Sequence, residues 1–238
     1  MKGLDLISYK EPTSPIAEAY RTLRTNIQFS SFDEKVKTIL VTSSGPGEGK
    51  TTTASNLAVV MAQSGNKTIL IDCDLRKPRV HKAFGISNQV GLSDLLADQM
   101  DQEGAIKLTE IPNLHVLSSG TRPPNPAELL GSGKMKKFVE ALKENYDVIV
   151  LDTPPIILVT DAQIIAQYAD GCLLVISSGQ AERESAIKAK QLLEKVNGKI
   201  LGVVFNKVDV TRKSYYHYSY EYGEKKSTNN NTGKRRRR

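Results

Sequence analysis

Short, almost wholly apolar runs alternate along this chain with segments whose apolar residues recur every three or four positions. Runs of the first kind are typical of strands in a parallel sheet, because helices cover both faces of such a sheet. Segments of the second kind are typical of amphipathic helices. The strand-like runs are 36–41, 68–71, 114–117, 147–152, 172–177 and 199–206, and the helical segments are 16–29, 51–63, 127–130, 134–145, 161–168 and 181–196. This alternation predicts an α/β fold built on a mostly parallel sheet.

The same pattern divides the chain into three parts. Residues 1–15 have mixed composition, contain prolines and show no periodicity, which predicts an extended N-terminal arm. Residues 16–210 carry all the periodic segments, and a stretch of this length can bury a full hydrophobic core as one domain. Residues 211–238 have no core pattern, and we expect a flexible tail there.

A glycine-rich turn lies between the first strand-like run and the helical segment that follows it. Such a turn aims backbone N–H groups and the positive end of the helix dipole at one point, where a phosphate can bind. Lys50 would reach the outer phosphates, and the Thr51 hydroxyl would bind Mg²⁺. The strict P-loop motif has glycine where this chain has Ser44. The residues expected to hold the nucleotide are Gly45, Pro46, Gly47, Glu48, Gly49, Lys50, Thr51 and Thr52.

Three aspartates stand at the ends of apolar runs. Asp72 and Asp74 follow the second run and share one direction on a strand, and Asp152 ends the fourth run. Carboxylates beside a phosphate-binding turn can hold hydrated Mg²⁺ or accept a proton, although aspartates are also common in ordinary turns. Because ligands of α/β sheets bind at the carboxyl ends of the strands, we expect Lys50 and the three acids to meet there.

The last strand-like run ends at Asn206, which begins the sequence Asn-Lys-Val-Asp. GTPases read guanine with Asn-Lys-x-Asp, but a four-residue match is a weak signal. GTPases also carry Asp-x-x-Gly after their second acidic strand, whereas this chain has Pro155 in place of that glycine. We therefore expect Asn206 to contact the base without conferring specificity for guanine.

The net charge of +7 comes largely from the C-terminus, because residues 234–238 supply five positive charges and leave +2 for the rest. We therefore expect no nucleic-acid partner, although the run Arg235–Arg238 could also touch anionic lipid or nucleic acid. No apolar run approaches the ~20 residues that span a bilayer, and the N-terminus has no signal-peptide pattern. Cys73 and Cys172 lie in apolar surroundings, which favours reduced core thiols over a disulfide.

Tyrosines are concentrated in the predicted tail, where five of the nine in the chain fall within eight residues. A segment that cannot fold and is rich in phenols offers accessible phosphate acceptors. A low-complexity tail, or a segment that stacks on nucleic acid, would have a similar composition. The candidate phosphoacceptors are Tyr215, Tyr216, Tyr218, Tyr220 and Tyr222.

Taken together, these motifs resemble the bacterial tyrosine kinase (BY-kinase) family, the cytoplasmic kinases of capsule and exopolysaccharide export systems. The resemblance runs from about Glu18 to Tyr222. The family's P-loop tolerates serine at the position of Ser44, which accounts for the departure noted above. Further segments similar to family motifs are 71–78, 123–130 and 150–155.

The resemblance implies an assembly that spacing alone does not. Glu18, Arg21 and Arg24 lie at steps of three, and spacing alone would favour a solvated face with a local ion pair. In the family this motif builds a ring-shaped homo-oligomer, by resemblance an octamer. The resemblance also implies that the tail tyrosines are phosphorylated in trans, by a neighbouring copy.

The resemblance further implies an ATP-dependent protein-tyrosine kinase with a P-loop NTPase-type fold and with ATP and Mg²⁺ as cofactors. Thr51, Asp74 and Asp152 would organise Mg²⁺, partly through water molecules. Asp72 is the candidate base that orients or deprotonates the attacking tyrosine, whose pKa of ~10 calls for such help at neutral pH. Lys50 completes the expected catalytic set.

Family resemblance also implies partners and a location. These are a transmembrane activator of the polysaccharide co-polymerase type, further tyrosine substrates, a cognate phosphatase, and a place at the inner face of the membrane. Two alternatives stay open, a MinD/ParA-like positioning ATPase and a non-catalytic subunit in which nucleotide only sets the conformation. MinD/ParA proteins carry lysine at the position of Gly45, which argues against the first alternative.

Overall fold

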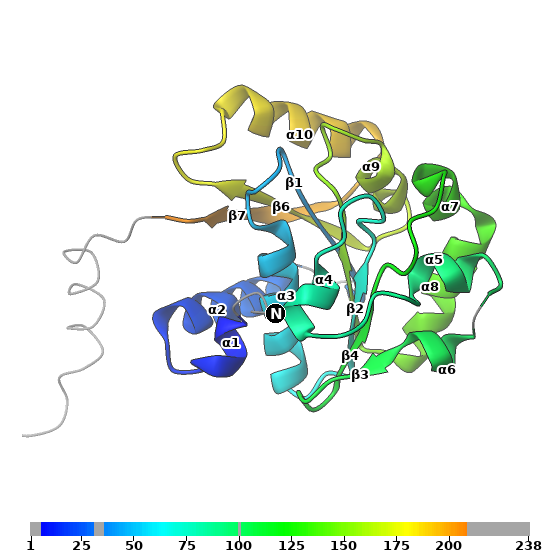
Figure 1. The fold of residues 1–238 in the computed structure, drawn as a ribbon. Helices are drawn as coiled ribbons and strands as arrows, with labels where there is room; N and C mark the ends of the chain where they lie inside the picture. Colours follow the sequence, from blue (N-terminus) through cyan, green and yellow to red (C-terminus); the bar gives the residue numbers. More distant parts are fainter. Residues whose placement is uncertain (1–5, 31–35, 100, 209–238) are drawn as a thin grey trace, which may run out of the picture. The chain divides into compact units, whose positions relative to one another are not determined.

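A computed structural model describes residues 6–30, 36–99 and 101–208 of the chain. A seven-stranded sheet runs through it in the order β3-β4-β2-β5-β1-β6-β7 (Figure 1), and the β3–β4 pair is antiparallel while the other pairs are parallel. The predicted α/β class and mostly parallel sheet are confirmed. The strands are β1 (Thr38–Ser43), β2 (Thr68–Asp72), β3 (Lys107–Leu108), β4 (Leu114–Leu117), β5 (Val148–Asp152), β6 (Gly171–Ser177) and β7 (Ile200–Asn206).

Helices cover both faces of the sheet (Figure 1). Helices α2, α3 and α4 pack through apolar side chains on one face, and α5, α8, α9 and α10 pack on the other. Helix α3 is buried on nearly every side because α2 covers the face that turns away from the sheet. The helices are α1 (Ile7–Lys10), α2 (Pro15–Phe29), α3 (Lys50–Gln63), α4 (Val80–Phe84), α5 (Leu92–Leu96), α6 (Gln102–Ala105), α7 (Pro126–Gly131), α8 (Gly133–Asn145), α9 (Asp161–Ala166) and α10 (Arg183–Lys195).

The order of the central strands brings three chain segments together at one edge. Strand β5 lies between β2 and β1, and in this register Asp72 pairs with Asp152, which in turn pairs with Val41. Adjacent strands lie only about 4.8 Å apart. The turn that follows β1 therefore lies beside the two loops that follow β2 and β5, as the positions of the aspartates predicted.

The prediction of an extended arm over residues 1–15 is wrong for its second half. Residues Ile7–Lys10 form the single helical turn α1, and α2 begins at Pro15 with Ser14 as its N-cap. The turn α1 is held by helix α3, because the Ser8 N–H donates to Asn56 Oδ1 at 2.9 Å and the Gln63 side chain donates to the Ser8 carbonyl at 3.0 Å. The absence of periodicity led to the prediction of an extended arm, but these contacts with a distant helix produce no periodic pattern in the sequence.

Two smaller expectations also change. Ile16 was expected on the apolar stripe of α2, but its side chain is 54% exposed, while Tyr20 and Ile27 of the same stripe are buried. Strand β1 runs two residues beyond the predicted run and ends at Ser43, because the register with β6 continues to that residue. The compact unit of the chain ends at Asn206, and a second unit begins at Lys207, so the predicted division at residue 210 stays a prediction.

Gly120 occupies a tight turn after β4, and we expect its replacement by alanine to destabilise the fold. Its φ angle is +79°, and a Cβ atom there would lie 2.1 Å from Asp94 Oδ2. The Gly120→Ala variant should therefore lose roughly 2 kcal/mol or more of unfolding free energy in urea denaturation. Gly133→Ala is the matched control, because a Cβ atom there meets nothing within 4 Å. Equal losses in the two variants would contradict the expectation.

Candidate active site

The turn between β1 and α3 has the backbone of a phosphate-binding loop. Gly47 and Gly49 have φ angles of +77° and +95°, which residues with side chains rarely adopt, and Gly49 is the N-cap of the 14-residue helix α3. The first N–H groups of α3 have no partner within the helix, so they and the helix dipole favour an anion at this point. The loop predicted from the sequence therefore has the conformation that phosphate binding needs.

Ser44, which departs from the strict motif, helps to shape this loop. Its hydroxyl donates to Glu48 Oε1 at 2.7 Å, and the Gly45 N–H donates to Glu48 Oε2 at 3.1 Å. Ser44 and Glu48 are both almost fully buried. The Glu48 carboxylate thus holds the start of the loop against its end, a contact that the motif alone did not indicate.

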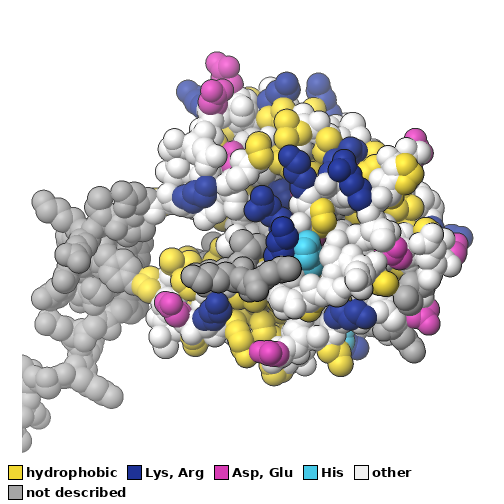
Figure 2. Space-filling model, in the orientation of Figure 1, with side chains coloured by type: hydrophobic (Ala, Val, Ile, Leu, Met, Phe, Trp, Pro, Cys, Tyr) yellow, Lys and Arg dark blue, Asp and Glu magenta, His cyan; other side chains and the backbone are white. Residues whose placement is uncertain are grey.

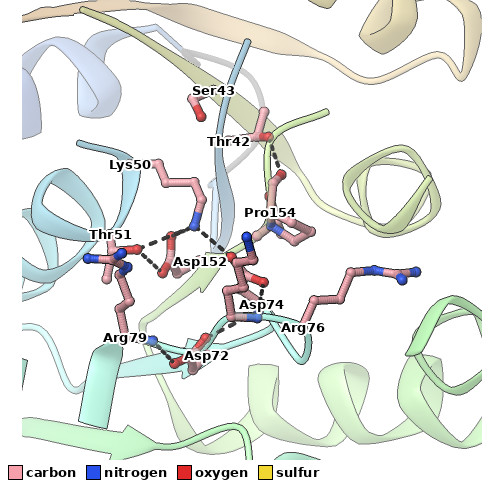
Figure 3. A network of polar contacts seen from close by, with 12 residues as sticks. Thr42, Ser43, Lys50, Thr51, Asp72, Asp74, Arg76, Arg79, Asp152 and Pro154 are labelled. Atoms are coloured by element: carbon pink, nitrogen blue, oxygen red, sulfur yellow. Dashed lines mark hydrogen bonds and ion pairs between the residues drawn. The ribbon is translucent and has the colours of Figure 1, made fainter. Parts of the chain in front are cut away.

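Lys50 and two of the predicted aspartates form one cluster at the carboxyl edge of the sheet (Figure 3). The Lys50 Nζ atom lies 3.0 Å from Asp74 Oδ2 and 3.7 Å from Asp152 Oδ1, and the Thr51 hydroxyl donates to Asp152 Oδ2 at 2.6 Å. Burial by itself lowers the pKa of Lys50, but the charges of Asp152 and Asp74 outweigh it and keep the pKa above its usual value. Lys50 is therefore a fixed positive charge beside the loop.

Asp72 lies behind this cluster and is fully buried. Its Oδ1 atom accepts the N–H of Asp74 at 3.2 Å, and its Oδ2 atom accepts those of Arg79 and Val80 at 3.1 and 3.0 Å. Burial and the charge of Asp152 raise the pKa of Asp72 to about 8. An acid with this pKa can exchange a proton near neutral pH. Its role as the base stays a prediction, since both oxygens accept backbone N–H groups.

The residues predicted to organise Mg²⁺ lie together beside the P-loop, and their role as its ligands stays a prediction. Asp152 Oδ1 is buried and accepts no hydrogen bond within the described part of the chain, and it faces Lys50 Nζ at 3.7 Å, so it has capacity left to bind a cation. Among the described residues, no three His, Cys, Asp or Glu side chains could hold a metal by themselves. Mg²⁺ commonly binds one or two carboxylates together with water and phosphate oxygens. Thr51, Asp74 and Asp152 fit that pattern.

Asn206 reaches the P-loop from the far end of the sequence. Its side-chain N–H donates to the Glu48 carbonyl at 2.9 Å. The structure therefore brings Asn206 to the predicted site, but through the loop backbone, and the predicted contact with the base stays a prediction. Asp209, which completes the Asn-Lys-x-Asp pattern, lies outside the described residues.

An ion pair that sequence reasoning missed joins two segments at this edge of the sheet. The Arg76 guanidinium binds both carboxylate oxygens of Asp161 at 2.9 Å each, and Asp161 is fully buried. Arg76 belongs to the loop after β2, whereas Asp161 begins helix α9 after β5. The pair therefore ties the loop that carries Asp74 to the segment that follows Asp152. Aspartates are common at the starts of helices, so the sequence around Asp161 does not indicate that it pairs with Arg76.

Positive side chains surround the site. On the face shown in Figure 2, lysines and arginines gather between α4 and α10, with few acidic residues among them. The segment from the end of β2 into α4 contains Arg76, Lys77, Arg79 and Lys82. Such a field attracts polyanions such as nucleotide phosphates.

The predicted interface motif on α2 divides into two parts. The Arg21 side chain pairs with Glu18 at 2.6 Å, and both are accessible to solvent. Arg24 instead donates to the Val60 carbonyl of α3 at 3.1 Å and is partly buried. Their role in an oligomer stays a prediction. The five tail tyrosines lie outside the described residues.

Known proteins are similar to this chain over most of its length. Residues 36–200 match a family model described as an AAA domain. The chain is 49% identical to tyrosine-protein kinase YwqD of Bacillus subtilis (strain 168) over 221 residues, which is 93% of this chain and 92% of YwqD. Among the helices of the described residues, none is long and apolar enough to cross a membrane.

Solved structures give the same result. The chimerical protein CapA2B2 is 42% identical, with a TM-score of 0.83 over 85% of this chain and 89% of that one. The septum site-determining protein MinD of Pyrococcus horikoshii, solved with Mg-ADP, is 26% identical, with a TM-score of 0.63 over 74% of this chain and 72% of that one. The likeness is therefore greater to CapA2B2 than to this MinD.

Proposed function

The chain belongs to the bacterial tyrosine kinase family, and we propose that it transfers the γ-phosphoryl group of ATP to tyrosines of its own C-terminal segment, in trans within a homo-oligomer. The observation that carries this proposal is the cluster at the P-loop, in which Lys50 lies against Asp74 and Asp152. Protein-tyrosine kinase is the enzyme class of the family. The acceptor and the assembly are the proposed parts.

The cluster supports phosphoryl transfer through position and charge. The loop N–H groups and Lys50 would hold the phosphates, with Thr51, Asp74 and Asp152 as the residues that hold Mg²⁺. When bound, this ion neutralises charge on the phosphate oxygens. Phosphoryl transfer requires mainly alignment of the reactants and stabilisation of charge. These residues can supply both. The attacking phenol loses its proton as its oxygen bonds to phosphorus and ADP leaves, and Asp72 is the proposed acceptor of that proton or the group that orients the phenol.

The remaining parts of the proposal rest on family resemblance. They are a ring-shaped octamer built through Glu18, Arg21 and Arg24, a transmembrane activator of the polysaccharide co-polymerase type that holds the chain at the inner face of the membrane, and a cognate phosphatase. Regulation of capsular or exopolysaccharide synthesis and export is the proposed purpose. The exposed Glu18–Arg21 pair supports an interface, because both charges can re-pair with a second copy.

A positioning ATPase is the second candidate function, because the fold is similar to that of MinD. Gly45 stands against it, since those ATPases carry a lysine there and this chain does not. A positioning ATPase would hydrolyse ATP without labelling itself, and a nucleotide-switch subunit would do neither.

Labelling of the tail separates these functions. Purified protein with Mg²⁺ and labelled ATP should acquire phosphotyrosine, and changing all five tail tyrosines to phenylalanine should remove nearly all of it. The matched control is Tyr9→Phe, because Tyr9 is 42% exposed yet lies outside the tail cluster. Its label should equal that of the parent. Full labelling of the five-phenylalanine variant, or ATP hydrolysis with no phosphotyrosine in the parent even when the cytoplasmic end of the activator is added, would contradict the proposal.

A further inference from the structure

The P-loop is held by a strand that is remote in sequence. Asn206, the last residue of β7, donates through Nδ2 to the Glu48 carbonyl at 2.9 Å across 158 residues. Its own backbone is fixed, because Asn206 pairs with Ser177 of β6 and its carbonyl accepts the Ser178 N–H at 2.8 Å. The hydrogen bond to the loop therefore comes from a rigid part of the sheet edge.

The fit between this side chain and the loop is close. A Cβ atom added at Gly49 would lie 2.0 Å from Asn206 Nδ2 and 3.2 Å from its Cγ. Gly49 thus has two reasons to be glycine, its φ angle of +95° and the amide packed against it. The Asn206 amide occupies the place that any other side chain at this position would need.

This contact fixes the direction of a phosphate-binding N–H group. In a planar trans peptide the C=O and the following N–H point in opposite directions. Because the Glu48 carbonyl points toward Asn206, the Gly49 N–H of the same peptide points away from Asn206. The Glu48 side chain is held as well, by Ser44 and Gly45. Glu48 is consequently anchored at both its carbonyl and its carboxylate, just before Lys50.

We propose that Asn206 is a positioning residue for the phosphate cradle and acts on the polyphosphate part of the nucleotide rather than on the base. This rests on the proposal that the site binds ATP. Loss of the Asn206 amide frees the Glu48–Gly49 peptide to rotate, and the bound phosphates lose an aligned donor. The loss is the same whichever base is attached, and also when no base is attached.

Calorimetric titration with Mg·ATP and with Mg·tripolyphosphate tests this inference, because tripolyphosphate has neither base nor ribose. The Asn206→Ala variant should bind both ligands more weakly by the same factor, about tenfold, as expected for one lost hydrogen bond in a closed site. Asn206→Asp keeps the shape against Gly49 but turns an oxygen toward the Glu48 carbonyl, and its added charge also repels phosphates. Both ligands should therefore bind to this variant more weakly still.

The control is Val203→Ala on the same strand, where the side chain is 49% exposed, and its two affinities should match those of the parent. Thermal unfolding without ligand shows whether each variant is folded. The inference is overturned if Asn206→Ala weakens ATP while tripolyphosphate binds normally, since that outcome assigns Asn206 to the base, or if neither ligand is affected. Failure of the parent to bind either ligand would instead overturn the proposed function.

Discussion

Replacing Lys50 with methionine should lower the rate of tyrosine phosphorylation by roughly a hundredfold to a thousandfold, the usual cost of losing one charge-stabilising group at a transition state. The Nζ atom lies 3.0 Å from Asp74 Oδ2 and 3.7 Å from Asp152 Oδ1, so Lys50 holds its charge beside the P-loop and the proposed Mg²⁺ ligands. Methionine has a similar length and no charge. The measurement is the initial rate of phosphotyrosine formation at saturating Mg·ATP.

The same substitution has a second effect on the site. Without the lysine, three buried or nearly buried aspartates face one another with no cation between them, which disfavours their ionised forms. The matched control is Lys190→Met, which removes an exposed lysine paired with Glu194 of its own helix. Its rate should stay within about twofold of the parent, as is usual for an isolated surface ion pair. A Lys50→Met variant that keeps the parent rate would remove the P-loop from the proposed mechanism.

The parts of the site that could be predicted from the sequence are those whose residues lie close together along the chain. A strand, a glycine-rich turn and the following Lys50 and Thr51 are contiguous, and the parallel order of the strands is enough to bring Asp72 and Asp152 alongside them. The chemistry of the cluster thus follows from local patterns together with the rule that sites form at the carboxyl ends of strands.

The supporting contacts were beyond prediction because they join positions far apart in the sequence. Arg76 and Asp161 are 85 residues apart, and Asn206 and Glu48 are 158 apart. Each partner alone is an ordinary residue of a loop, a strand end or a helix start. The helical turn α1 was missed for a related reason, since a turn this short depends on tertiary contacts rather than on its own propensity.

The predicted interface motif on helix α2 contains residues in two different environments. Glu18 and Arg21 face solvent, but the guanidinium of Arg24 binds the Val60 carbonyl of α3. Helix α3 begins at Lys50, so the helix with the predicted interface is attached to the helix that opens at the P-loop. If α2 forms the proposed interface, loss of Arg24 would act inside one chain as well as between chains, and changes at Glu18 and Arg21 would test the interface more selectively.

Changing Asp72 to asparagine should alter how the stability of the ligand-free protein depends on pH. Burial and the charge of Asp152 raise the pKa of Asp72 from its usual 3.8 to about 8. Between these values the native state keeps a proton that the unfolded chain has lost. The unfolding free energy of the parent therefore falls as pH rises through this range, by on the order of 1 kcal/mol for each pH unit from this group. Asparagine does not titrate, so this decrease is absent from the variant. The unfolding free energy of Asp72→Asn minus that of the parent should therefore rise steadily from pH 5 to pH 8.

Urea denaturation at several pH values, with a chelator present, measures this difference. Glu140→Gln removes a 64% exposed carboxylate instead, and its curve should run parallel to that of the parent. Parallel curves for Asp72→Asn and the parent would show that Asp72 is already ionised in the native state. Adding Mg·ADP should make the unfolding free energy of the parent depend less on pH. A cation held by Asp74 and Asp152 would favour the ionised form of Asp72, which lies behind them. The pH dependence of folding and the binding of the nucleotide thus depend on the same group of buried carboxylates.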